Sequence, residues 1–161
     1  MLLISINAIG QSQTYSVSKD TVDGGVVFNG LITLDDLSNE ASFSWMKSGI
    51  EDYKPYASAV DFLRTYLKDY SLVVFMGTWC DDSQNLIPRL AKVLKEADFP
   101  LAKLSLYGTD RAKKTKSRED RQYDVEKVPT IIVFKKGKEV GRITETVRKS
   151  IEDDLSAIIA F

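Results

Sequence analysis

The stretch at residues 72–83, LVVFMGTWCDDS, limits the fold more than any other part of the chain. Its first seven residues carry no charge and are mostly apolar, which is typical of a strand buried on both faces of a sheet. Gly77 ends the apolar run, and two aspartates and Ser83 then favour a helix N-terminus. From Leu86 onwards apolar side chains recur at helical spacing. The sequence therefore predicts a buried strand followed directly by an amphipathic helix over residues 81–97.

Cys80 lies at this junction between strand and helix and is the only cysteine of the sequence. Unpaired backbone N–H groups and the helix dipole at a helix N-terminus stabilise a thiolate. The carboxylates of Asp81 and Asp82 oppose this effect, because they disfavour another negative charge nearby. We therefore expect Cys80 to be a moderate nucleophile. The alternative is a buried cysteine that acts only as a small apolar side chain.

The composition excludes several kinds of site and partner. The 161 residues include no histidine, which excludes histidine-based catalysis and zinc sites built from His and Cys, and we expect neither a metal nor a cofactor. A single cysteine cannot form an internal disulfide. The formal net charge is −1, so the overall charge gives no reason to expect nucleic acid or an acidic membrane as a partner. No stretch approaches the length of a membrane span.

The chain divides into three parts by sequence. Residues 1–13 resemble the end of an export signal without its basic start, so we expect export to the periplasm; the alternative is an N-terminal strand of a cytoplasmic protein. Residues 14–57 are expected to form an N-terminal extension, with a short strand at 26–28 on the edge of the sheet and one or two short helices after Thr33. Residues 58–161 are expected to form the main domain.

The main domain has the pattern of an α/β fold with a sheet of about four or five strands. A strand, a helix and a second strand in succession predict a parallel strand pair. The polar, largely basic residues 108–122 are best interpreted as a solvated loop; a second hypothesis is that Arg111, Lys113 or Lys114 steers an anionic client or a small thiol. After the helix at residues 81–97, we expect strands at residues 101–107, 130–135 and 140–143 and a final helix from about residue 148.

Several of these motifs together resemble the thioredoxin superfamily. Residues 79–83, WCDDS, look like its strand-to-helix active site, and Pro88 falls where its members carry a proline in the active-site helix. Residues 128–130, Val-Pro-Thr, look like its cis-proline loop. The resemblance covers about residues 58–160, and residues 77–80 are similar to a group of bacterial thioredoxin-like proteins that are often exported. It implies a thioredoxin-like mixed sheet flanked by helices and preceded by an N-terminal extension.

Two positions depart from the thioredoxin pattern. Ser83 replaces the second cysteine, which makes the motif a monothiol CxxS, and Val74 replaces a buried acid. A serine hydroxyl cannot attack a mixed disulfide and release the client. The resemblance therefore implies thiol–disulfide exchange through Cys80 without an internal resolving thiol, with protein or small-molecule thiols and disulfides as partners. The alternative is a non-catalytic binding or scaffold domain that has kept only the fold.

The expected site combines a nucleophile with a client groove. Cys80 is the expected nucleophile and Ser83 its neighbour one helical turn on, although Ser83 and Asp82 have the alternative role of helix caps. A cis bond between Val128 and Pro129 would present backbone groups to which an extended peptide can pair. The residues expected to contact the client are Trp79, Asp82, Val128 and Pro129.

Overall fold

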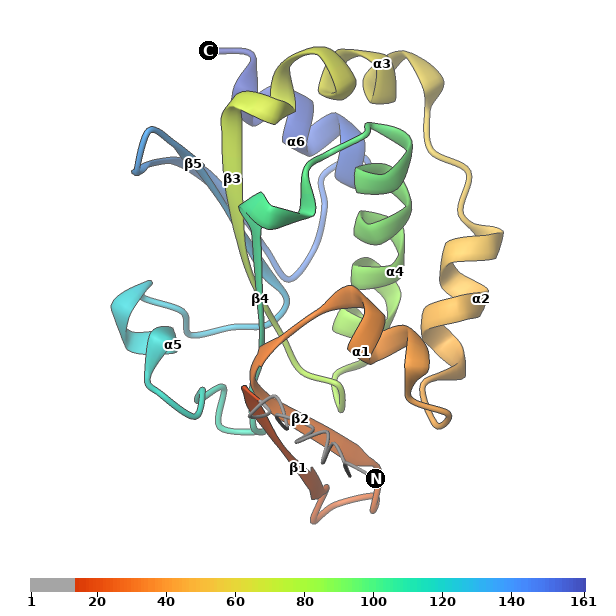
Figure 1. Cartoon of the computed structure of the whole chain (residues 1–161), viewed down its shortest axis with the longest axis vertical. Coiled ribbons are helices and arrows are strands. Elements are labelled where there is room, and N and C mark those ends of the chain that lie inside the picture. The colour runs from red at the N-terminus through yellow and green to blue at the C-terminus, as the bar shows by residue number, and fades with distance from the viewer. Residues whose placement is uncertain (1–13) are drawn as a thin grey trace, which may run out of the picture.

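The computed structural model describes residues 14–161, and the export signal expected at residues 1–13 lies outside the described residues. The strands are β1 (Tyr15–Lys19), β2 (Val26–Ile32), β3 (Tyr70–Met76), β4 (Leu104–Gly108), β5 (Thr130–Lys135) and β6 (Lys138–Thr144). They form one six-stranded sheet with the order β1-β2-β4-β3-β5-β6 (Figure 1). β3 and β4 run parallel, and each other neighbouring pair in this sheet is antiparallel. The fold is therefore an α/β fold with a mixed sheet.

Most helices cover one face of the sheet. The helices are α1 (Leu34–Asn39), α2 (Ser44–Asp52), α3 (Ala57–Tyr66), α4 (Asp81–Glu96), α5 (Glu119–Gln122) and α6 (Ile151–Ile159), with single 3-10 turns at Leu67–Asp69 and Leu101–Lys103. Figure 1 shows α2, α4 and α6 on one side of the sheet and the short α5 on the other. Within residues 14–161, no helix combines the length and the apolar character that crossing a membrane requires.

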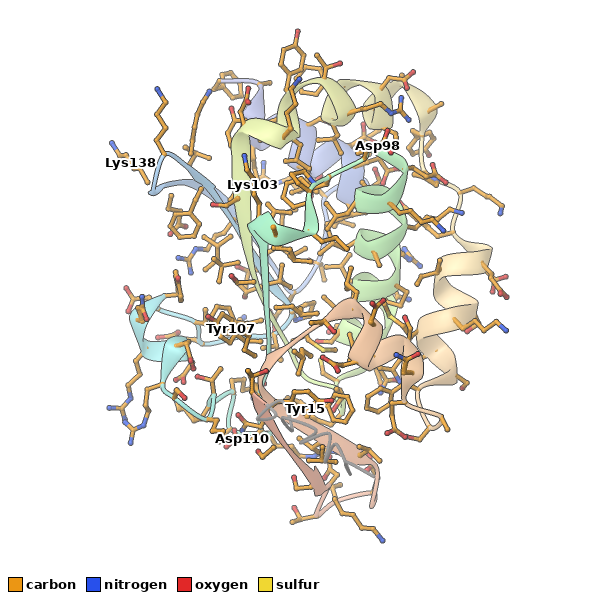
Figure 2. The ribbon with its side chains drawn as sticks, viewed as in Figure 1. Tyr15, Asp98, Lys103, Tyr107, Asp110 and Lys138 are labelled. Atoms are coloured by element: carbon orange, nitrogen blue, oxygen red, sulfur yellow. The ribbon has the colours of Figure 1, made fainter. Side chains whose placement is uncertain are left out.

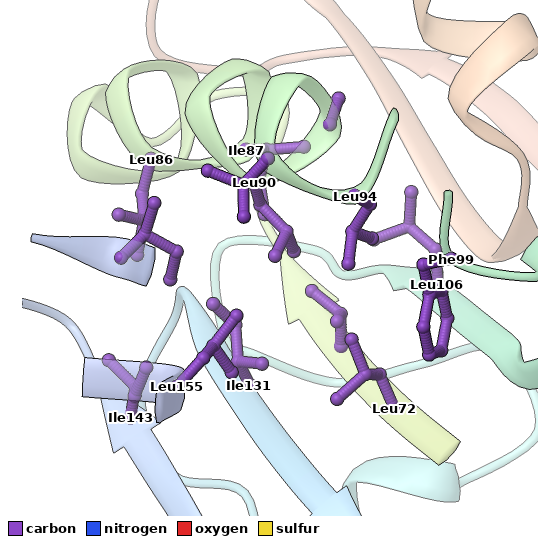
Figure 3. Packing of buried hydrophobic residues seen from close by; sticks show 14 of the residues in the cluster. Leu72, Leu86, Ile87, Leu90, Leu94, Phe99, Leu106, Ile131, Ile143 and Leu155 are labelled. Carbon is purple, nitrogen blue, oxygen red and sulfur yellow. The ribbon is translucent and has the colours of Figure 1, made fainter. Parts of the chain in front are cut away.

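The central strand β3 divides the interior into two cores, because alternate side chains point to opposite faces. Leu72 and Val74 are fully buried in the larger core, where the apolar face of α4 packs on the sheet (Figure 3). Leu86, Leu90 and their neighbours on α4 supply its upper layer. Pro88 is buried within the same helix. Val74 occupies the position at which many thioredoxins have a buried acid. In this protein that position is apolar and lies in a well-packed core.

The smaller core lies on the α5 side of the sheet. Val73 and Phe75 of β3 pack there against Val125, Val128 and Ile132. Several half-buried aromatic side chains complete it, among them Tyr107 of β4, whose ring stacks on that of Phe75 with 5.1 Å between centroids (Figure 2). Trp79 and Cys80 border this core. The candidate site therefore lies at the rim of the smaller core, where the cover of the sheet is thin.

The N-terminal hairpin of β1 and β2 reaches the carboxyl ends of β3 and β4. β2 pairs antiparallel with β4, with Gly30 opposite Gly108. Gly108 lets the two backbones approach, since a Cβ atom at this position would lie 2.2 Å from the carbonyl oxygen of Phe28. The turn at residues 20–25 precedes β2 and therefore lies beyond the end of β4, beside the loop that leads from β3 to α4.

The segment between α2 and α3 is held to α6 by a buried carboxylate. Glu152 is fully buried and accepts hydrogen bonds from the hydroxyl of Tyr53 at 2.7 Å and from the backbone N–H of Tyr56 at 2.9 Å. Burial and this carboxylate raise the pKa of the Tyr53 hydroxyl, which keeps it a donor. The carboxylate thereby fixes the extension to the C-terminal helix.

The sheet differs in two ways from the sequence-based expectation. It has six strands rather than four or five, because the extension adds two. The strand expected at residues 26–28 extends from Val26 to Ile32 and lies inside the sheet, while β1 forms the edge. β1 was not expected, since its sequence YSVSK is largely polar and its side chains are mostly exposed. It forms because it pairs with β2.

Some element boundaries also differ. The central strand covers Tyr70–Met76 rather than residues 72–78. Residues 101–103 form a 3-10 turn, so that the strand expected from residue 101 begins at Leu104. The last helix begins at Ile151 rather than near residue 148, because the Ser150 side chain caps it by accepting from the N–H of Asp153.

Candidate functional site

Cys80 is the N-cap residue of α4 and is half-buried. Its backbone N–H donates to the carbonyl of Gly77 at 3.0 Å, and its carbonyl accepts from the N–H of Gln84 at 2.9 Å, which fixes the turn between strand and helix. The thiol donates to the carbonyl oxygen of Val128, with 3.6 Å between Sγ and O. The Val128–Pro129 peptide bond is cis. The structure thus brings together the cysteine and the Val-Pro pair that the sequence places 48 residues apart.

Ser83 is fully buried, and its hydroxyl oxygen accepts a hydrogen bond from the backbone N–H of Gly77 at 3.1 Å. This bond ties the first turn of α4 to the end of the preceding strand. The Ser83 hydroxyl therefore stabilises the turn between β3 and α4. Since a hydroxyl cannot replace a thiolate as a nucleophile towards disulfides, Cys80 has no chemical partner at this position.

Asp81 and Asp82 are exposed in the first turn of α4. Asp82 is not the N-cap residue of α4, because Cys80 occupies that position, and the Cys80 side chain makes no capping hydrogen bond. Carboxylates in this turn interact favourably with the positive end of the helix dipole.

Trp79 is half-buried and fixed at several points. Its indole Nε1–H donates to the carbonyl of Thr109 at 2.9 Å. The guanidinium of Arg111 lies 5.2 Å from the centre of the indole, and Nζ of Lys113 lies 5.9 Å from it. The ring also packs on Gly77, where an added Cβ atom would come within 2.5 Å of ring atom Cε2. The indole therefore has a defined orientation next to Cys80.

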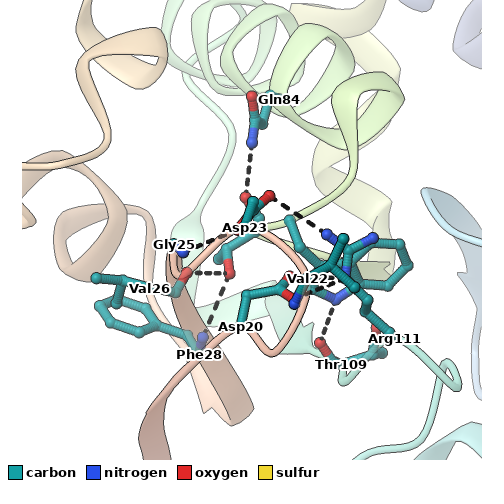
Figure 4. A network of polar contacts seen from close by, with 11 residues as sticks. Asp20, Val22, Asp23, Gly25, Val26, Phe28, Gln84, Thr109 and Arg111 are labelled. Carbon is teal, nitrogen blue, oxygen red and sulfur yellow. Dashed lines mark hydrogen bonds and ion pairs between the residues drawn. The ribbon is translucent and has the colours of Figure 1, made fainter.

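The hairpin turn at residues 20–25 lies beside Arg111 and Thr109 (Figure 4). The Nε–H of Arg111 lies between both oxygens of the Asp20 carboxylate, at 2.8 and 2.7 Å, and its Nη2 lies 3.3 Å from Asp23. The hydrogen bond from Arg111 is the main cause of a pKa of Asp20 below its ordinary range, and the bond from the N–H of Val22 adds to it. Asp20 in turn raises the pKa of Arg111. Both groups are therefore charged at neutral pH.

Thr78 and Gln84 connect the same hairpin to the active-site loop. The hydroxyl of Thr78 donates to the carbonyl of Val26 at 2.9 Å and accepts from the N–H of Phe28 at 3.3 Å. The side-chain amide of Gln84 donates to the carbonyl of Thr78 at 2.7 Å (Figure 4). The loop that carries Trp79 and Cys80 is thus held from both β2 and α4.

The basic loop after β4 is built around a buried carboxylate. Asp120 accepts from the backbone N–H and the hydroxyl of Thr115, at 2.9 and 3.0 Å, and lies 3.4 Å from Nζ of Lys114. Burial raises the pKa of Asp120, but these contacts outweigh it and the pKa is lowered. Because Arg111 and Lys114 have acidic partners, Lys113 is the cation that remains for the hypothesis of anionic steering.

A hollow of about 260 Å³ opens between Trp79, Gln84 and the N-terminal extension, whose Phe43 and Trp45 line its opposite wall. Trp79 is the expected site residue that borders this hollow. Among residues 14–161, no three His, Cys, Asp or Glu side chains gather in a way that would hold a metal ion.

Sequence reasoning found the cysteine and its loop but missed several residues that support them. The missed contacts are the hydrogen bonds between Arg111 and Asp20 of the hairpin and the hydrogen bond from Trp79 to Thr109. Asp20 and Arg111 are 91 residues apart, and neither belongs to a motif or an apolar period. No signal in a single sequence would have joined them.

Comparison with known proteins assigns the class. The family described as "Thioredoxin" matches residues 57–159, nearly two thirds of the chain, so the chain belongs to the thioredoxin family. The fold and the family that the resemblance implied are confirmed. A comparison with curated proteins gave no match.

Among solved structures, the protein is similar to mitochondrial thioredoxin 3 of Saccharomyces cerevisiae, with 19% identity over 58% of this chain and 78% of that chain and a TM-score of 0.40. It is similar to Trxlp of Edwardsiella tarda, with 20% identity over 65% and 95% and a TM-score of 0.42. A Pseudomonas aeruginosa protein of unknown function gives 18% identity over 81% and 75% and a TM-score of 0.47. With scores this low, the family assignment depends on the family match.

Proposed function

We propose that this protein takes part in thiol–disulfide exchange through Cys80 and carries no internal thiol to complete the cycle. The observation that carries the proposal is the position of Cys80, half-buried at the N-terminus of α4 and 3.6 Å from the carbonyl of Val128. Membership of the thioredoxin family and the presence of a single cysteine support it.

The proposed reaction has two steps. The Cys80 thiolate attacks one sulfur of a client disulfide, forms a Cys80–client disulfide and expels the other client sulfur as a thiolate, which takes up a proton from water. An external thiolate then attacks the mixed disulfide and releases Cys80. The second step needs this external thiol because Ser83 has no sulfur. The protein therefore transfers a disulfide between partners without storing one itself.

The client groove that we propose lies around Trp79. The indole and Cys80 border the same small core, and we propose that an extended client peptide pairs with the backbone at Val128 and Pro129. Asp82 is exposed, and we propose that it contacts side chains of a client bound in this groove. Disulfides of proteins and of small thiols are the proposed partners.

The test is the formation of a mixed disulfide. Reduced protein is mixed with oxidised glutathione or cystamine at neutral pH, and the intact mass is followed over time. We expect one added thiol per chain, none in Cys80→Ser, and slow loss of the adduct until an external thiol is added. Absence of an adduct, together with an intact biological role in Cys80→Ala, would contradict thiol–disulfide exchange and favour the rival function, a non-catalytic binding or scaffold domain.

We also propose export, which is supported by the mostly apolar residues 2–10 and the polar residues that follow them. Mass spectrometry of the mature N-terminus from the native source tests it. Cleavage near residue 13 supports export, and a chain that retains residues 1–13 contradicts it.

A further inference from the structure

One side chain, Arg111, connects the N-terminal hairpin to the tryptophan beside the thiol. Its guanidinium bonds to both oxygens of Asp20, at 2.8 and 2.7 Å, and approaches Asp23 at 3.3 Å. The same guanidinium lies 5.2 Å from the centre of the Trp79 indole. A cation at this distance from an indole is attracted to the ring.

The hairpin end of this connection is rigid. The side chain of Asp20 is only 1% exposed, and it also accepts from the N–H of Val22 at 2.8 Å. Its backbone bonds across the turn to Gly25 and Gly24, at 2.7 and 3.0 Å. Because a buried carboxylate is costly without a cation, the ion pair with Asp20 holds the Arg111 side chain at the turn.

The tryptophan end has one other polar anchor. The indole donates to the carbonyl of Thr109, and one edge of the ring packs on Gly77. Contact with Arg111 adds a cation 5.2 Å from the centre of the ring, which favours one direction of the ring plane. Asp20 and Asp23 lie outside residues 57–159, so the extension adds this contact to the family domain.

We propose that Arg111 is a positioning residue of the Cys80 site: anchored by Asp20, it holds the Trp79 indole beside the thiol and thereby sets how fast the sulfur reacts and which disulfides reach it. The consequence for exchange rests on the function proposed above. The proposed effects on the orientation of the Trp79 ring and on the alkylation rate of Cys80 do not depend on that function.

The neighbouring cations do not share this arrangement. Lys113 lies 5.9 Å from the same ring, but its partners do not include the hairpin carboxylates, which bond to Arg111. Lys114 pairs with Asp120. Arginine is suited to the role because its planar fork can bond a carboxylate while its face lies against an aromatic ring.

The test uses Trp45→Phe as the background, which leaves Trp79 as the single tryptophan. In this background we expect Arg111→Ala to increase acrylamide quenching of Trp79 and to change the rate of Cys80 alkylation by iodoacetamide by about fivefold, the size that corresponds to one lost cation–π contact. Asp20→Asn should shift both readouts in the same direction. The double variant should show the same quenching and alkylation rate as Arg111→Ala alone, because the two substitutions act through one contact.

Lys113→Ala is the matched control, since it removes a positive charge near the ring and leaves the hairpin ion pair intact. It should increase quenching less than Arg111→Ala does, because Lys113 lies farther from the ring and has no hairpin carboxylate to hold it; an equal increase would contradict the particular role of Arg111. Circular dichroism establishes that each variant is folded; if Arg111→Ala is not, Asp20→Asn and Arg111→Lys carry the test. Unchanged quenching in a folded variant overturns the proposal, and so does increased quenching with an unchanged alkylation rate. If the parent protein forms no mixed disulfide, the proposed function fails, while quenching and alkylation still decide the role of Arg111.

Discussion

The backbone N–H of Gly77 donates a 3.1 Å hydrogen bond to the side-chain oxygen of Ser83, which is fully buried. The position at which a dithiol thioredoxin would carry its second cysteine is therefore occupied by a residue that stabilises the active-site turn. Replacing it has consequences for both stability and chemistry.

Ser83→Ala should lower the free energy of unfolding by about 1–3 kcal/mol, because the buried N–H of Gly77 loses its acceptor. Urea unfolding monitored by circular dichroism measures the change. Ser48→Ala is the matched control: its hydroxyl donates to the carbonyl of Ser44 on an exposed helix face, and its loss should cost less than about 0.5 kcal/mol. Equal costs for the two variants would show that the Ser83 bond contributes nothing particular.

Ser83→Cys should convert the site into a dithiol. Residues at the N-cap and N3 positions of a helix lie on the same side of its first turn, so the new thiol faces Cys80. We expect oxidation to an internal disulfide, seen as the loss of two hydrogens in the intact mass, and a short-lived client adduct. A client adduct that persists as in the parent protein would contradict the expected geometry.

Gly77→Ala should disturb the tryptophan, since the new Cβ atom would lie 2.5 Å from the rigid indole of Trp79. We expect a loss of stability of about 1–3 kcal/mol, typical of overpacking, and a shifted fluorescence spectrum. In a Trp79→Ala background the same substitution should cost much less. A cost that is unchanged in that background would place its cause in the backbone.

Asp20 should make stability depend on pH in the acid range. Its pKa is lowered in the folded protein, so its ion pair stabilises the fold above the pKa of an unfolded aspartate, about 3.9, and the stabilisation is lost as the pH falls from there through the folded-state pKa. Asp20→Asn should therefore flatten the decline of unfolding free energy between about pH 5 and pH 2. Urea unfolding at a series of pH values measures this, and a decline as steep as in the parent protein would contradict it.

Glu152→Leu should lower the free energy of unfolding by about 2–4 kcal/mol, because two donors, the Tyr56 N–H and the Tyr53 hydroxyl, lose their acceptor. Glu152→Gln retains one carbonyl acceptor and should cost less. Denaturant unfolding compares the two. A leucine variant that is as stable as the parent would show that desolvation of the carboxylate offsets its hydrogen bonds. Alkylation of Cys80 should be unchanged in both.

Local patterns were enough to predict much of the fold. The apolar run of β3 and the helical period of α4 are properties of neighbouring residues, so the order of strand, cysteine and helix could be read directly. The hairpin of β5 and β6 carries β-branched residues around a turn at Gly137, which is again a local signal. Edge strand β1 was missed because its polar sequence has no strand pattern, and pairing with β2 decides its conformation.

The sequence by itself determined that this chain belongs to the thioredoxin family and that Cys80 is its one candidate for a reactive thiol. These properties depend on the identity of residues and on their local order. Only the tertiary structure decided that Ser83 bonds to Gly77, that Cys80 faces Val128, and that Asp20 reaches Arg111 and through it Trp79. The last two contacts join segments that approach one another when β2 pairs with β4 and β3 with β5, whereas the Ser83 bond depends on the turn between β3 and α4. The pairing of strands sets these distances, and the spacing of residues along the chain does not record it.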